Sequence, residues 1–117
     1  MPASILVIDD DADVRGILAE SLKEGGYSVT EASGGRQGLQ LLESNSFDLV
    51  IIDYAMPGMM GPEVAAAVKE LIPDQKLLLV SGYAATSAVE TAAESIPLLG
   101  KPFKFDDLHA TVRELLG

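Results

Sequence analysis

The chain has 117 residues, and its 18 acidic and 8 basic side chains give a formal net charge of −10. This length suits one domain with one hydrophobic core, and such an acidic balance argues against direct nucleic-acid binding while leaving cations or basic partners open. The absence of cysteine excludes disulfides, zinc–thiolate sites and thiol chemistry, and 48% hydrophobic residues are too many for a disordered acidic tail.

Short apolar runs alternate with helical patterns along the chain. Five strands are predicted, at residues 5–8, 27–32, 49–52, 77–80 and 97–99. The first, third and fourth runs are apolar throughout, which is typical of strands buried on both faces, whereas 27–32 alternates like a strand at a sheet edge. Apolar residues spaced three and four apart predict helices at 14–22, 34–44, 64–72, 84–94 and 108–116.

This alternation predicts an α/β fold, namely a single (βα)5 domain over residues 1–117 with a doubly wound parallel five-stranded sheet. The apolar runs are far shorter than the ~20 residues that span a bilayer, and no targeting segment is visible. We therefore expect a cytoplasmic chain without membrane insertion. In such a sheet, ligands bind outside the carboxyl ends of the strands.

Polar side chains stand where the predicted strands end. Asp9 and Asp10 follow the first strand, Asp53 the third, Ser81 the fourth and Lys101 the fifth. Crowded carboxylates repel one another, and a hard divalent cation such as Mg²⁺ is their natural partner. A carboxylate nucleophile, a hydroxyl and an ammonium group are the parts that phosphoryl transfer needs, which makes Asp53 the candidate nucleophile.

Three other polar residues have ordinary structural explanations. Asp11 and Asp13 lie where the first helix begins, and acids there cap and stabilise a helix N-terminus. His109 is the only histidine, and we expect it on the last helix, half-exposed and away from the acidic edge. The methionines of one loop either pack above the third helix or form a soft partner surface: Met56, Met59 and Met60.

Five stretches, in order and over the full length, resemble the receiver domain of bacterial two-component response regulators, the CheY-like superfamily. They are Ile5–Asp11, Asp48–Asp53, Met56–Gly58, Ser81–Ala84 and Lys101–Phe103. The resemblance implies a flavodoxin-like strand order of 2-1-3-4-5, for which a member of this family is itself a standard example.

The resemblance also implies the chemistry of the site. Asp53 would accept a phosphoryl group from a phosphohistidine on a histidine kinase or histidine phosphotransfer domain. Asp9, Asp10, Asp53 and the backbone carbonyl of Ala55 would hold the Mg²⁺ ion. The small side chain of Ala55 would leave room for an attacking water molecule.

Further roles follow from the same resemblance. Ser81 would close on the phosphoryl group, and Lys101 would pair with it, with a cis bond to Pro102. Tyr83 would flank and cover the site. Leu98 departs from the family, because a switch tyrosine or phenylalanine usually stands at that position.

Several alternatives remain open from the sequence. The chain is either a stand-alone regulator or the receiver of a hybrid sensor histidine kinase, and it catalyses only its own phosphorylation and dephosphorylation. A homodimer through the fourth helix, fifth strand and last helix is a further option. The runner-up functions are a small Mg²⁺-dependent aspartyl-phosphate phosphatase or phosphotransferase, which would need a cap that 117 residues do not supply, and a flavin carrier, whose phosphate the acids would repel.

Overall fold

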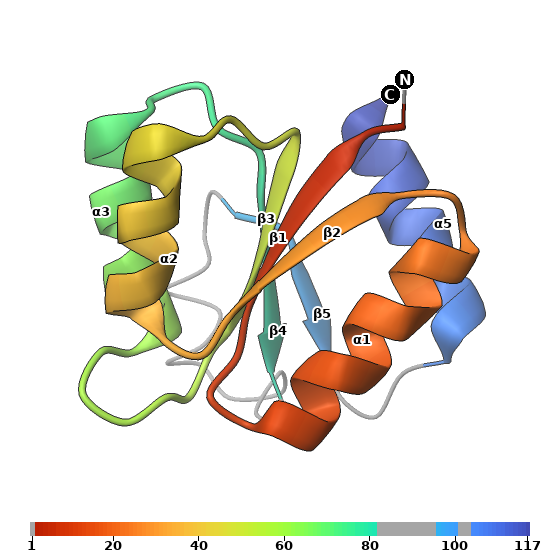
Figure 1. Cartoon of the computed structure of the whole chain (residues 1–117), viewed down its shortest axis with the longest axis horizontal. Coiled ribbons are helices and arrows are strands. Elements are labelled where there is room, and N and C mark those ends of the chain that lie inside the picture. Colours follow the sequence, from red (N-terminus) through yellow and green to blue (C-terminus); the bar gives the residue numbers. More distant parts are fainter. Residues whose placement is uncertain (1, 82–95, 101–103) are drawn as a thin grey trace.

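The computed structural model describes residues 2–81, 96–100 and 104–117. Its centre is a five-stranded parallel sheet in the order β2-β1-β3-β4-β5, with helices on both faces (Figure 1). The strands are β1 (Ser4–Ile8), β2 (Ser28–Ala32), β3 (Leu49–Asp53), β4 (Leu77–Ser81) and β5 (Leu98–Gly100). The predicted fold class and strand order are therefore confirmed.

The described helices are α1 (Ala12–Glu24), α2 (Gly35–Ser44), α3 (Gly61–Leu71) and α5 (Phe105–Leu116). The expected helix 84–94 lies outside the described residues. Two helices begin one turn earlier than the apolar pattern predicted, α3 at Gly61 instead of Val64 and α5 at Phe105 instead of Leu108. The first turn of α5 is exposed, and that of α3 begins with glycine, proline and glutamate, so neither has a stripe of large apolar side chains to read.

The three central strands contribute to two cores, because neighbouring residues of a strand point to opposite faces of a sheet. Figure 1 shows α1 and α5 on one side of the sheet and α2 and α3 on the other. On the α1/α5 side the buried strand residues are Ile5, Val7, Leu49, Ile51, Leu78 and Val80. On the α2/α3 side they are Leu6, Ile8, Val50, Ile52, Leu77 and Leu79. Burial on both faces explains why these strands read as continuous apolar runs.

The two sheet edges differ from the centre. β2 is an edge strand, as its alternating sequence predicted, and β5 on the other edge is only three residues long. Leu98 in β5 is half-buried and packs against the α2/α3-side core.

The loop methionines differ in burial. Met56 is buried in the α2/α3-side core and Met59 packs against it, whereas Met60 is 39% exposed. Ordinary packing therefore accounts for two of the three loop methionines.

The only histidine joins two helices on the α1/α5 side. His109 of α5 is half-buried, and its Nε2 lies 2.9 Å from the Oγ of Ser21 in α1. It is the semi-exposed helix residue that the sequence predicted, with a structural hydrogen bond that the sequence did not reveal.

No helix among the described residues combines the length and apolarity needed to cross a membrane.

Gly61 lets the start of α3 pass close to the end of β3. Its backbone N–H donates to the carbonyl of Tyr54 at 2.7 Å. A Cβ atom at this position would lie 2.5 Å from the carbonyl oxygen of Asp53 and 2.8 Å from the Cα of Tyr54. Both are backbone atoms, so the clash cannot be relieved by turning a side chain.

We predict that Gly61→Ala lowers the free energy of unfolding by about 1–3 kcal/mol, because the added methyl group forces backbone atoms apart. Gly16→Ala is the matched control within α1, since a Cβ there meets no atom within 4 Å. It should raise stability by about 0.5–1 kcal/mol through the better helix propensity of alanine. Urea denaturation measures both changes, and equal effects of the two substitutions would contradict the packing argument.

Candidate functional site

The strand register brings the carboxyl ends of β1, β3 and β4 together. Ile8 of β1 is paired with Ile52 of β3, and Asp53 is paired with Val80 of β4. Asp9 directly follows Ile8, so it leaves the sheet beside Asp53. Ser81 is one residue beyond Val80 and is therefore next to Asp53 on the other side. Asp53 and Ser81 are the last residues of their strands, not the first residues after them as the sequence suggested.

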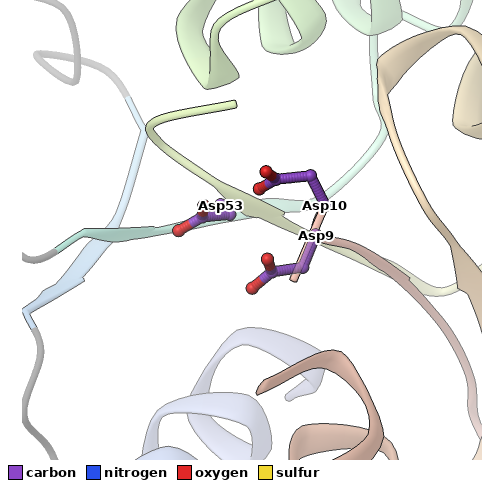
Figure 2. A group of neighbouring side chains, drawn as sticks. All are labelled: Asp9, Asp10 and Asp53. Carbon is purple, nitrogen blue, oxygen red and sulfur yellow. The ribbon is translucent and has the colours of Figure 1, made fainter. Parts of the chain in front are cut away.

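Asp9, Asp10 and Asp53 form an acidic cluster at this edge. One carboxylate oxygen of each lies within 4.8 Å of the others, and Figure 2 shows the three carboxylates pointing to the same side. Asp9 is buried at 2% exposure, Asp53 is half-buried and Asp10 is exposed. Residues at the ends of two strands far apart in sequence thus converge as predicted.

The spacing and chemistry of the acidic cluster fit one divalent cation. An octahedral Mg²⁺ holds oxygen ligands at about 2.1 Å, so two ligands on opposite sides of it are about 4.2 Å apart. The oxygens of the cluster span a comparable distance, 4.8 Å at most. Three like charges this close destabilise one another unless a cation compensates them. The described part of the chain therefore contains a set of oxygen ligands that can hold a metal.

Backbone and side-chain hydrogen bonds hold the turn between β1 and α1 that carries two of these acids. Asp9 N donates to the carbonyl of Ala32 at 3.1 Å, and Asp9 Oδ1 accepts from Asp11 N at 2.9 Å. Asp11 caps α1, because its Oδ1 accepts from the N–H groups of Asp13 at 2.9 Å and Val14 at 3.1 Å. The predicted capping role of Asp11 is confirmed, and Asp13 lies in the first turn.

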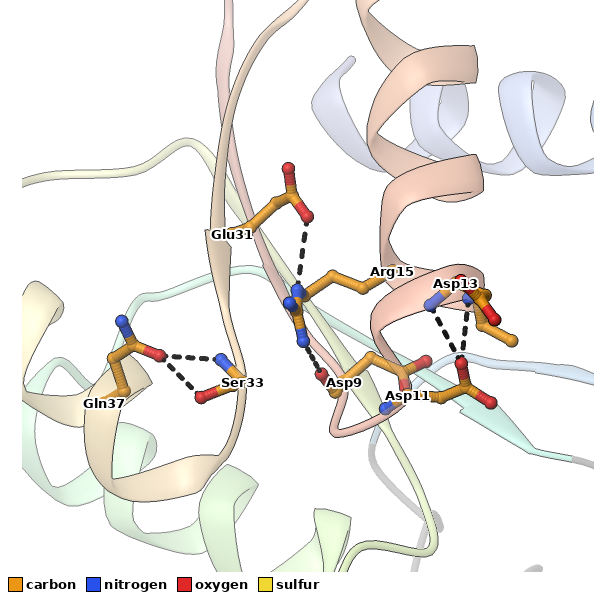
Figure 3. Close-up of polar contacts among 8 residues, drawn as sticks. Asp9, Asp11, Asp13, Arg15, Glu31, Ser33 and Gln37 are labelled. Carbon is orange, nitrogen blue, oxygen red and sulfur yellow. Dashed lines mark hydrogen bonds and ion pairs between the residues drawn. The ribbon is translucent and has the colours of Figure 1, made fainter.

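Arg15 is a residue near the site that the sequence analysis did not single out. Its Nη1 donates to the backbone carbonyl of Asp9 at 2.8 Å, and its Nε lies 3.2 Å from Glu31 Oε1 in β2 (Figure 3). One sequence feature could have flagged it. A cation in the second turn of a helix gains nothing from the helix dipole, which favours cations at the opposite end.

The structure describes only some of the remaining predicted site residues. Ser81 is buried at 1% exposure beside Asp53, and Ala55 is exposed in the loop after β3. Tyr54 N donates to the carbonyl of Val80 at 2.9 Å, which ties the start of this loop to β4. Tyr83, Lys101 and the Lys101-Pro102 bond lie outside the described residues.

Comparison with known proteins identifies the family. The family model described as "Response regulator receiver domain" matches residues 5–113. The response regulator receiver protein CpdR of Brucella abortus is 33% identical over 114 residues, which cover 96% of this chain and 95% of CpdR. The sensor kinase CckA of the same species is 34% identical over 118 residues, but these cover 97% of this chain and only 12% of CckA.

Solved structures agree with the sequence relatives. The response regulator TrrA of Thermotoga maritima, crystallised in complex with Mg²⁺-BeF, superposes with a TM-score of 0.89 at 34% identity, covering 98% of this chain and 99% of TrrA. The family match, these relatives and the acidic cluster at the ends of β1 and β3 agree with one another. The chain belongs to the response regulator receiver family of two-component signalling.

Proposed function

We propose that this receiver domain accepts a phosphoryl group on Asp53. The observation that carries the proposal is the convergence of Asp53 with Asp9 and Asp10 at the carboxyl edge of the sheet, in a chain of the receiver family. Asp53 is half-buried, so its carboxylate is held by β3 and still reachable from solvent. A carboxylate in such a position can form an acyl phosphate.

The proposed reaction is a transfer between two side chains. A carboxylate oxygen of Asp53 attacks the phosphorus of a phosphohistidine on the partner, and the phosphorus–nitrogen bond breaks. The electron pair of that bond stays on the imidazole nitrogen of the donor. The reaction needs the attacking oxygen in line with the leaving nitrogen, and β3 supplies the rigid support for this orientation because it is hydrogen-bonded on both sides, to β1 and to β4.

We propose Mg²⁺ as the metal, held by Asp9, Asp10, Asp53 and the backbone carbonyl of Ala55. When bound, it supplies positive charge that neutralises the phosphoryl oxygens and the carboxylates. The oxygen-only ligand set supports a hard cation. TrrA, whose printed description names a complex with Mg²⁺-BeF, supports the same choice.

Four further residues belong to the proposal. Ser81 would donate a hydrogen bond to the phosphoryl group, which its position one residue beyond the partner of Asp53 supports. Lys101 would neutralise the same group, and Tyr83 would cover it. Leu98 is half-buried against the core, so we propose that any switching at this position occurs by repacking of an aliphatic side chain instead of rotation of an aromatic ring.

The biological setting that we propose follows from the family. The donor is a histidine kinase or a histidine phosphotransfer domain in the cytoplasm, and residues 1–117 act as one receiver domain. The chain is a phosphoacceptor switch that catalyses only its own phosphorylation and dephosphorylation. It corresponds to nearly all of the receiver protein CpdR but to 12% of the sensor kinase CckA, and these two relatives support either a stand-alone regulator or the receiver of a hybrid sensor histidine kinase.

Asp53→Asn should abolish phosphorylation by acetyl phosphate and Mg²⁺, because an amide oxygen cannot replace the nucleophilic carboxylate. Mass spectrometry of the intact protein should show one added phosphoryl group on the natural chain and none on the variant. Asp74→Asn is the matched control, since Asp74 is exposed and precedes β4 at the other end of the sheet. Labelling of the Asp53→Asn variant at the natural level would refute the proposal.

Asp10→Asn should weaken Mg²⁺ binding by about tenfold or more, because one charged oxygen ligand is lost. In the presence of a chelator the same variant should be more stable by about 1 kcal/mol, since one like-charge repulsion is relieved. Isothermal titration calorimetry measures the first effect and urea denaturation the second. Asp13→Asn, an exposed acid outside the cluster, is the control, and an equal loss of Mg²⁺ affinity in both variants would contradict a local site.

A further inference from the structure

Arg15 reaches from α1 to two other elements of the fold. Its Nη1 donates to the backbone carbonyl of Asp9, 2.8 Å away, in the turn after β1. Its Nε is paired with Glu31 Oε1 in β2 at 3.2 Å, and the Arg15 side chain is only 18% exposed. Figure 3 shows the guanidinium group between these two partners. A planar guanidinium with donors in a fixed fork is thereby held in one orientation.

The hydrogen bond from Arg15 acts on the peptide group that leads into Asp10. The carbonyl of Asp9 and the N–H of Asp10 belong to the same planar unit. Fixing the direction of that carbonyl therefore fixes the orientation in which the backbone enters Asp10. Asp10 is the exposed member of the acidic cluster, so packing restrains its side chain least. The direction of that side chain therefore depends mainly on the orientation of its backbone.

Neither the helix dipole nor the ion pair with Glu31 explains why an arginine stands at position 15. A cation in the second turn of α1 gains nothing from the helix dipole, which favours cations at the opposite end. The ion pair with Glu31 is a weak source of stability, because the Glu31 side chain is 37% exposed and exposed pairs contribute little. The hydrogen bond to the Asp9 carbonyl is the remaining interaction of the Arg15 side chain.

We infer that Arg15 is a positioning residue for the Mg²⁺ site: anchored by Glu31, it holds the Asp9–Asp10 peptide so that Asp10 is directed at the cation. This inference rests on the proposed function, which names the cation. Glu31 has two effects in this arrangement. It fixes the guanidinium, and it neutralises a positive charge that would otherwise repel a cation bound by the acidic cluster.

The test is the dissociation constant for Mg²⁺ of the unphosphorylated protein, measured by calorimetry for the natural chain, Arg15→Lys and Arg36→Lys. Lysine keeps the charge but has no planar fork to reach both partners. Arg15→Lys should weaken Mg²⁺ binding by about tenfold, the usual effect of losing a residue that orients a metal ligand. Arg36→Lys should leave it unchanged, because Arg36 is an exposed arginine in the first turn of α2.

A purely structural role predicts a different result, namely a lower melting temperature in chelator with an unchanged dissociation constant for the folded protein. That result overturns the inference. Glu31→Gln is the second variant in case Arg15→Lys does not fold; it should also weaken Mg²⁺ binding, by less than Arg15→Lys, and an unchanged constant counts against the inference. If the natural chain itself binds no Mg²⁺, the proposed function fails and the inference with it, so the two failures are distinguishable.

Discussion

Repulsion between like charges is the main constraint at the carboxyl edge of the sheet, where Asp9, Asp10 and Asp53 lie together. A parallel sheet brings the ends of neighbouring strands to one edge. Here Asp9 and Asp10 directly follow β1 and Asp53 ends β3, and their carboxylate oxygens lie within 4.8 Å of one another. In the unfolded chain, Asp9 and Asp53 would be separated by more than forty intervening residues. Bringing them together costs electrostatic free energy, and a cation held by the cluster would lower this cost and raise the stability of the domain.

The free energy that opposes this repulsion comes from the centre of the sheet. Each central strand buries alternate side chains in the α1/α5 core and the α2/α3 core, so a shift by one residue would exchange side chains between the two cores and disrupt the packing of both. This fixed register keeps Asp53 between Asp9 and Ser81. The turn after β1 adds local restraint through the bonds of Asp9, Asp11 and Arg15.

The parts of the structure that the sequence predicted are those that follow from periodicity and topology. Continuous apolar runs indicated buried strands, and their parallel arrangement was sufficient to place Asp9, Asp10 and Asp53 together. Helix starts were predicted less well, because the first turn of α3 has too few apolar residues to show a stripe.

Contacts that depend on tertiary geometry were not predictable from one sequence. Arg15 donates to a backbone carbonyl, and every residue has such a carbonyl, so no residue type marks the acceptor. Ser21 and His109 are 88 residues apart, and neither lies in a motif. Likewise, no sequence pattern distinguishes the buried Met56 from the exposed Met60. Packing alone decides that difference.

The positions of the two chain ends bear on how this domain can be joined to others. Both ends lie near each other where β1 begins (Figure 1), whereas the acidic cluster lies where β1 and β3 end. Ala3 and Leu116 line one shared depression near the chain ends. α5 runs back across the sheet and brings the C-terminus beside the start of β1. An attached domain, tag or fluorophore at either end would therefore leave the acidic edge open, and insertion of the entire unit into a loop of another protein would need only a narrow gap in the host.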